Sequence, residues 1–258
     1  MKINFYKKTG WWLTGILLSQ PLLAQEFDAV LMWSQRVELG TFVTGVISEV
    51  NADVGQHVKS GDILVKLEDK VLVADVRKGE AQLKIAHDTM EEARRDKDHA
   101  DELYARTVLS DHELQQAYIK LTRTEADYES ANAALIRARA TLKYSRVTAP
   151  FDGVVINCNA SVGQTVVSSL QTQPLIILGG TSRMLARVAM NEDQIKNIAV
   201  GNKAEVKING KLFDGAVAHV GLEPIRYDNS VAMYEVDINF ATAGTSLRAG
   251  QKVIAVIR

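Results

Sequence analysis

The fold is decided by residues 145–155, which read SRVTAPFDGVV. This stretch follows a long helical pattern with almost no linker. Pro150 ends that pattern and biases Ala149 toward an extended backbone. Asp152-Gly153 then supplies a turn signal before a β-branched run. A strand that begins here needs a pairing partner, and we expect that partner to precede the helices.

The helical segment covers residues 70–145, where Gly79 is the only glycine or proline. Ser110 and Glu113 have capping-box spacing, so one helix should end near Thr107 or Val108 and another should start at Asp111. Two helices joined by so short a turn run antiparallel. Each half carries apolar or small residues in a heptad seam. The seams are Val76, Gly79, Leu83, Ala86, Met90, Ala93, Lys97, Ala100 and Tyr104, then Leu114, Ala117, Leu121, Thr124, Tyr128, Ala131, Leu135, Ala138 and Leu142.

An antiparallel hairpin returns the chain to its starting point, so residues 67–69 and 147–150 should lie close together. Residues 37–69 are strand-like, with glycine punctuation, but hold too few strands to close a core alone. A weak repeat relates DVGQHV, residues 53–58, to SVGQTV, residues 161–166. We therefore predict two similar half-units that complete one β-sandwich, with the helical hairpin inserted between them.

The first 24 residues have a basic start, a short apolar core and a cleavage-like Leu-Leu-Ala. This arrangement predicts a secretory signal peptide, because a membrane span needs roughly 20 apolar residues. An uncleaved membrane anchor remains the alternative. Under either reading the body of the protein is exported.

The composition excludes several classes of function. Net charge is −1 and aromatic residues are 6%, which disfavours nucleic acid as a partner. Cys158 is the only cysteine, so neither an internal disulfide nor a cysteine-based zinc site can form. The five histidines show no metal-ligand spacing, and neither a nucleophile elbow nor a phosphate loop occurs. We expect no catalytic residues, no cofactor and no metal, and hence not an enzyme.

GVISEVNADVGQHVKSGDILVKLED, residues 45–69, resembles the first half of the lipoyl-like domain of periplasmic adaptor proteins, also called membrane fusion proteins. VTAPFDGVV, residues 147–155, resembles the start of its second half. Residues 185–221 and 247–257 resemble the β-barrel domain of the same family. The similarity is strongest to adaptors of resistance-nodulation-division efflux pumps, followed by haemolysin-D-like secretion adaptors.

The resemblance implies an adaptor that bridges an inner-membrane transporter and an outer-membrane channel in a tripartite pump exporting small toxic compounds. The transporter would be of the resistance-nodulation-division type in preference to the ATP-driven type. The adaptor would be periplasmic, associated with the inner membrane of a Gram-negative envelope, and self-associated in a ring, hexameric in the family.

The resemblance also places the channel contact at the hairpin tip. In the family an Arg-Leu pair, a Leu and a Ser engage the channel. Leu103 and Ser110 match that pattern, whereas His99 and Ala100 stand where the Arg-Leu pair would be. The predicted contact residues are Leu103, Arg106, Val108, Leu109, Ser110 and Asp111.

Two alternative functions stay open. Lys70 lies where a lipoyl or biotinyl carrier would attach its cofactor, but we favour a solvated lysine at a helix start. An envelope coiled-coil scaffold without a transporter is the other alternative. It is favoured by the expectation that the family's membrane-proximal domain is missing or rudimentary here, since little precedes Arg36 and the sequence stops at Arg258.

The predicted fold is α+β and elongated. Residues 1–24 form the signal peptide and residues 25–35 an N-terminal segment. Residues 36–69 and 146–180 form the lipoyl-like sandwich, residues 70–145 the helical hairpin, and residues 181–258 a β-barrel domain. Within that last domain, Asn191 should cap a short helix and Asn209-Gly210 should turn a two-residue hairpin.

Overall fold

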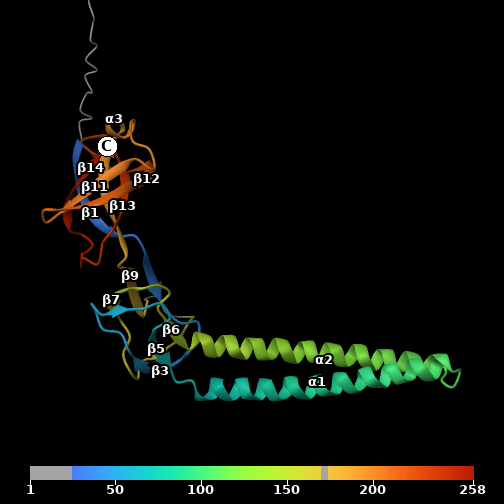
Figure 1. Ribbon diagram of the computed structural model, residues 1–258. Coiled ribbons are helices and arrows are strands. Elements are labelled where there is room, and N and C mark those ends of the chain that lie inside the picture. Colours follow the sequence, from blue (N-terminus) through green and yellow to red (C-terminus); the bar gives the residue numbers. More distant parts are fainter. Residues whose placement is uncertain (1–24, 170–173) are drawn as a thin grey trace, which may run out of the picture. The chain divides into compact units, whose positions relative to one another are not determined.

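The computed structural model describes residues 25–169 and 174–258, which separate into two compact units (Figure 1). One unit contains residues 25–30 together with Ala186–Ile238 and Lys252–Arg258. The other takes Leu31–Leu185 and Asn239–Gln251. The expected signal peptide, residues 1–24, lies outside the described residues.

The second unit contains a sandwich of two four-stranded sheets. Its strands are β2(Arg36–Leu39), β3(Gly45–Val50), β4(His57–Val58) and β5(Ile63–Leu67), then β6(Arg146–Thr148), β7(Gly153–Cys158), β8(Thr165–Val166) and β9(Ile176–Gly180). The strand orders are β2-β9-β7-β4 and β6-β5-β3-β8. The two halves of the chain occupy equivalent places in the two sheets. If β2, β3, β4 and β5 are exchanged for β6, β7, β8 and β9 in turn, the order of one sheet becomes the order of the other. Each sheet therefore mixes both halves of the chain, and neither half completes a sheet without the other.

The joint predicted at residues 145–155 is confirmed. Strand β6 pairs antiparallel with β5, with Val147 opposite Val65. The Leu67 amide donates to the carbonyl oxygen of Ser145 at 2.9 Å, which fixes the points where the chain leaves and re-enters the sandwich. Both valines belong to the buried core of the sandwich, so burial as well as pairing holds the halves together.

Two matching turns bear out the weak sequence repeat. Gly55 and Gly163 both adopt a left-handed backbone, with φ of 87° and 84°. In each turn a glutamine side chain accepts a hydrogen bond from the backbone amide three residues earlier. The Asp53 amide donates to Gln56 Oε1 at 2.8 Å, and the Ser161 amide donates to Gln164 Oε1 at 3.0 Å. A β-branched or other L-residue would be strained at either glycine.

The insertion is a hairpin of two long helices, α1(Lys70–Ala105) and α2(Asp111–Tyr144) (Figure 1). At 1.5 Å per residue each is roughly 50 Å long. The predicted seams are confirmed, because every seam side chain is buried or half-buried except that of Tyr104. A methyl group at Gly79 would lie 3.3 Å from the Cα of Leu135, so the helices approach closely there. Helix α1 ends at Ala105, two or three residues earlier than the predicted end near Thr107 or Val108.

The other unit is built around a closed barrel in the order β1-β10-β13-β12-β11-β14. Its elements are β1(Gln25–Trp33), β10(Arg183–Asn191), α3(Glu192–Ile195), β11(Lys203–Ile208), β12(Lys211–Asp228), β13(Val231–Ala241) and β14(Lys252–Ile257). Asn191 caps α3 through a capping box, as predicted. Asn209 and Gly210 both have positive φ, as a type I′ turn between β11 and β12 requires.

Strand β1 is an element that the sequence did not predict. It pairs antiparallel with β14, from Gln25 opposite Ile257 to Val30 opposite Lys252. Ala29 and Leu31 are buried while Val30 is exposed, which is the alternation of a half-buried strand. The pattern is short and follows an apolar segment, so no separate strand signal distinguishes it.

Candidate functional site: the hairpin tip

The turn between α1 and α2 begins with a compact helix ending. The Val108 amide donates to the Leu103 carbonyl at 3.0 Å, and the Thr107 amide donates to the Tyr104 carbonyl at 2.9 Å. These two bonds form a Schellman motif, whose left-handed position is usually glycine. Here that position is Thr107, with φ of 57°. A β-branched residue in this conformation is uncommon and strained.

Helix α2 begins with the predicted capping box. The Glu113 amide donates to Ser110 Oγ at 3.4 Å, and the Ser110 amide donates back to Glu113 Oε2 at 3.0 Å. The hydrogen bonds from Ser110 lower the pKa of the Glu113 carboxyl below its usual 4.5. Across the tip, a hydrogen bond to Asp111 raises the pKa of the Tyr104 hydroxyl. The tip is therefore held by its own bonds and needs no partner to keep its shape.

All six predicted contact residues lie within this turn and its flanking helix ends. Leu103 and Leu109 are half-buried, and the other four are exposed. Val108 is 70% exposed, although it is apolar. Thr107 lies among them and was not predicted, because nothing in its sequence context signals a left-handed threonine. The tip thus presents apolar, cationic and hydroxyl groups together on a pre-shaped surface.

A polar cluster locks the two helices just below the tip. The Lys97 ammonium lies 2.8 Å from Asp101 Oδ2, and the Tyr118 hydroxyl donates to Asp101 Oδ1 at 3.1 Å. Hydrogen bonding to Asp101 raises the pKa of Lys97, and hydrogen bonding to Lys97 lowers that of Asp101. On the opposite flank Lys120 donates to Asp96 at 2.7 Å. These bonds fix the register of α1 against α2 just below the tip.

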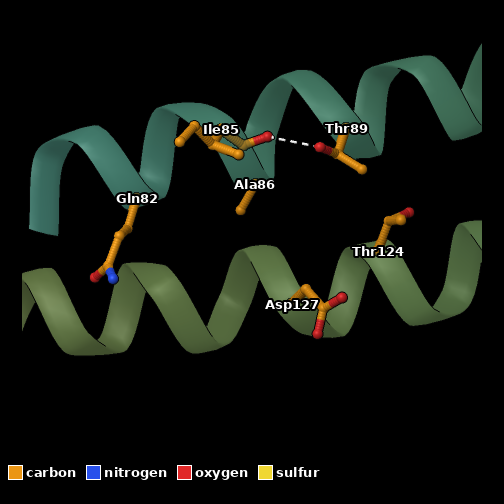
Figure 2. Close-up of a pocket in the computed structure, with 6 residues that line it drawn as sticks. All are labelled: Gln82, Ile85, Ala86, Thr89, Thr124 and Asp127. Carbon is orange, nitrogen blue, oxygen red and sulfur yellow. Dashed lines mark hydrogen bonds between the residues drawn. The ribbon is translucent and has the colours of Figure 1, made fainter.

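Midway along the hairpin a shallow groove of about 270 Å³ opens between the helices (Figure 2). Figure 2 shows Gln82 and Ala86 directed from α1 toward α2, with Thr124 and Asp127 on the facing helix. The hydroxyl of Thr89 donates to the carbonyl of Ile85 at 2.9 Å, and that of Thr124 bonds its own helix in the same way. Of the six residues that line the groove, Asp127 alone is charged.

The described residues contain no group of three or more His, Cys, Asp or Glu side chains that could hold a metal ion. Lys70 is the first residue of α1, and its ammonium lies 3.7 Å from Glu68 Oε1. In a carrier domain the modified lysine sits at a strand hairpin turn, whereas here a helix starts instead. Among the helices within residues 25–169 and 174–258, none combines the length and apolarity that a membrane span requires.

Comparison with protein families matches residues 36–173 to the CzcB-like, barrel-sandwich hybrid domain. This range starts at β2 and contains the helical hairpin together with strands from both halves of the sandwich. It covers more than half of the chain.

Similar curated proteins include the macrolide export protein MacA of Yersinia pestis, 26% identical over 240 residues. That match covers 85% of this chain and 64% of the relative. The multidrug resistance protein MdtA of Escherichia fergusonii is 26% identical over 162 residues, covering 63% of this chain and 39% of the relative. The chain therefore matches less than two thirds of the length of these relatives.

Solved structures agree on the fold. A MacA-MexA chimeric protein carrying the Pseudomonas aeruginosa MexA α-hairpin domain superposes with a TM-score of 0.67 at 25% identity, covering 91% of this chain and 78% of that one. The membrane fusion protein Spr0693 of Streptococcus pneumoniae R6 gives a TM-score of 0.69 at 17% identity, covering 91% and 98%. The second likeness concerns the fold alone. With its hairpin-split sandwich followed by a barrel, the chain belongs to the CzcB-like barrel-sandwich hybrid family of membrane fusion proteins, the periplasmic adaptors.

Proposed function

We propose that this protein is the adaptor subunit of a tripartite efflux pump. It would join an inner-membrane transporter to an outer-membrane channel, and its sandwich and barrel would line the exit path as copies assemble in a ring. The relatives named for macrolide export and multidrug resistance support small toxic compounds as the exported class. In this role the protein supplies shape and contact surface, so it needs no reactive group.

The observation that carries the proposal is the long hairpin, which leaves and re-enters one sandwich at a single point. Leu67 and Ser145 are hydrogen-bonded there, and Arg146 pairs with Asp69 at 3.1 Å. A rod of two interlocked helices tied firmly at its base can carry a binding surface about 50 Å from the body that holds it. An adaptor that spans a gap between two membrane proteins requires this property.

We further propose that the hairpin tip, with Leu103, Arg106, Val108, Leu109, Ser110 and Asp111, contacts the channel. The transporter would be of the resistance-nodulation-division type. The location would be the periplasm, against the inner membrane of a Gram-negative envelope. The exposed, apolar side chain of Val108 supports a docking role for the tip.

A gene deletion tests the proposed function. We expect the deletion strain to become several-fold more sensitive to a subset of toxic compounds in a broad panel, and the wild-type gene to restore resistance. A Val108→Asp variant should accumulate normally but restore less resistance, because a buried contact cannot accept an unpaired carboxylate. Unchanged sensitivity of the deletion strain to every compound, with no other adaptor gene present, would contradict the proposal.

A further inference from the structure

A cavity of about 1040 Å³ lies in the unit that contains the sandwich. Every residue of its lining belongs to Leu31–Leu185 or Asn239–Gln251, so the cavity is a feature of that one unit. Strands β4 and β7 contribute to one wall, and the loop between β13 and β14 contributes to the other. A space of this size can hold a drug-sized molecule. The apolar lining residues include Trp33, Val54, Val154, Ile156, Met184 and Leu247.

Trp33 is seated directly on the backbone of a sandwich sheet. A methyl group at Gly179 would lie 2.8 Å from Cδ2 of Trp33 and 2.9 Å from Cδ1 of Ile156, so the glycine makes room for both side chains. Trp33 is half-buried, and its indole N–H has no hydrogen-bond partner among the described residues. Because no fully buried side-chain nitrogen in that part of the chain lacks a partner, this N–H is accessible to solvent. The wall therefore offers an aromatic ring together with an available donor.

The facing loop, residues 242–250, is tied to the same unit at both ends. The Thr242 hydroxyl donates to the Thr181 carbonyl at 2.7 Å. At the other end, the Gly250 amide donates to the Leu31 carbonyl at 2.8 Å. These bonds hold the loop in place without a ligand. A bound molecule would therefore meet a preformed wall and lose little affinity to ordering it.

The charged groups of the lining favour an anion. Arg248 is exposed on the loop, and within residues 25–169 and 174–258 no ion pair involves its guanidinium. Asp152 is the acidic residue of the lining, and its Oδ1 already accepts a hydrogen bond from the Ser60 amide at 2.8 Å. His57 is the remaining titratable group. An unpaired guanidinium binds oxyanions through two parallel donors, and the indole N–H of Trp33 adds a further donor to the lining.

We propose that this cavity binds a compact aromatic organic anion, of the aryl carboxylate or aryl sulfonate class. Its rings would pack against the indole of Trp33 and the side chain of Met184, and its acidic group would accept hydrogen bonds from Arg248. Ring–ring and sulfur–ring contacts favour a flat aromatic body over an alkyl chain. A bound molecule would touch both the sheet and the loop. The inference does not depend on the proposed adaptor role.

Fluorescence titration of the purified full-length chain tests the charge of the ligand. The anionic probe is anilinonaphthalenesulfonate, and its neutral counterpart N-phenylnaphthylamine has the same rings without the sulfonate. We expect the anionic probe to bind about tenfold more tightly, which is the contribution of a hydrogen bond to a charged group.

Competition against the bound anionic probe tests the aromatic body. Naphthoate and decanoate carry the same carboxylate on a similar number of carbons, but decanoate has no ring. Naphthoate should displace the probe at a concentration about threefold to tenfold lower than decanoate, because it alone can stack on an indole.

Two variants locate the site. Arg248→Gln should weaken binding of the anionic probe about tenfold and leave the neutral probe unchanged, because the amide has no charge. Arg95→Gln, at an exposed α1 position outside the lining, is the matched control and should change neither probe. Ser246→Trp adds bulk to the lining and should weaken both probes. All three positions are exposed, so circular dichroism should show an unchanged fold.

Equal affinity for the two probes, or unchanged affinity of Arg248→Gln for the anionic probe, would overturn the assignment of an anion. Unchanged binding of both probes by Ser246→Trp would place the binding outside this cavity. Stronger displacement by decanoate than by naphthoate would exclude the aromatic class. Each measurement uses the isolated chain without a channel or a transporter, so the inference can fail while the adaptor role stands.

Discussion

Gly153, in the Pro-Phe-Asp-Gly stretch, allows two neighbouring strands of the sandwich to approach each other closely. A methyl group at this position would collide with the backbone carbonyl oxygen of Gly179 on the neighbouring strand β9. Strands β7 and β9 both belong to the second half and form the centre of one sheet. The glycine is therefore required by close approach of two backbones, since its own φ is not in the left-handed region.

Replacing Gly153 by alanine should destabilise the protein by about 2–3 kcal/mol, because the backbone of β9 cannot yield as a side chain can. Gly45→Ala is the matched control, since its methyl group would meet only the flexible Cδ2 of Leu67, at 3.0 Å. Urea unfolding followed by circular dichroism measures both variants. Equal losses for Gly153→Ala and Gly45→Ala would show that the contact with Gly179 is unimportant.

Thr107 at the hairpin turn pays a conformational penalty that glycine would not. A left-handed backbone costs an ordinary residue about 1–2 kcal/mol. Thr107→Gly should therefore stabilise the hairpin by about 1 kcal/mol, whereas Ala105→Gly, in the last helical turn, should destabilise it by a similar amount. Thermal unfolding at 222 nm distinguishes them. A destabilised Thr107→Gly variant would mean that the threonine side chain makes a stabilising contact at the tip.

At the scale of elements, the hairpin depends on carboxylates whose pKa values are lowered by their partners. Lys120 lowers the pKa of Asp96, Lys97 lowers that of Asp101, and Ser110 lowers that of Glu113. A group with a lowered folded-state pKa contributes its stability in full above its unfolded value, about pH 4, and loses it as the pH falls through the folded value. The hairpin should therefore weaken below about pH 4.

This acid sensitivity can be assigned with neutral variants. Asp96→Asn and Asp101→Asn should lower the hairpin melting temperature at pH 7 and flatten its dependence on pH between about 5 and 2, because the titrating group is gone. Glu102→Gln, at an exposed α1 position for which the described chain offers no ion pair, serves as the control. Melting curves with the same pH dependence in all three variants would assign the effect to other groups.

Sequence patterns predicted these elements to different degrees. The heptad seams, the Ser110 cap and the Asn209-Gly210 turn were all predictable, because each depends on local residue type and spacing. Strand β1 was not predictable, because both strands beside it in the barrel, β10 and β14, lie far from it in the sequence. The end of α1 was misplaced because Thr107, a poor residue for a left-handed cap, holds that position.

For the whole molecule, the account requires that the sandwich be completed by two distant parts of the chain. Replacing residues 70–144 by a short glycine-serine linker should leave the sandwich folded, since Leu67 and Ser145 are already hydrogen-bonded. Amide hydrogen exchange should still protect β5 and β6. Removing β6 to β8 with the hairpin should abolish the protection of β5, because each sheet then loses strands of the second half. Independent protection of the first half alone would be inconsistent with the shared sheets.

The candidate site was predictable in position but not in shape. The sequence placed the tip residues by their spacing from the Ser110 cap and by family resemblance. It could not indicate that Val108 projects while Leu109 is half-buried, because that depends on the left-handed turn at Thr107.

Photo-cross-linking from Val108 tests the adaptor role most directly. A photoreactive amino acid at Val108 in the full-length protein, expressed in its own cells, should capture an outer-membrane channel protein. The same residue at Lys84, on the exposed outer surface nearer the hairpin base, should not. Capture of the channel from Val108 alone is the predicted result. Normal accumulation of the Val108 variant without any channel adduct, or equal capture from both positions, would contradict the account.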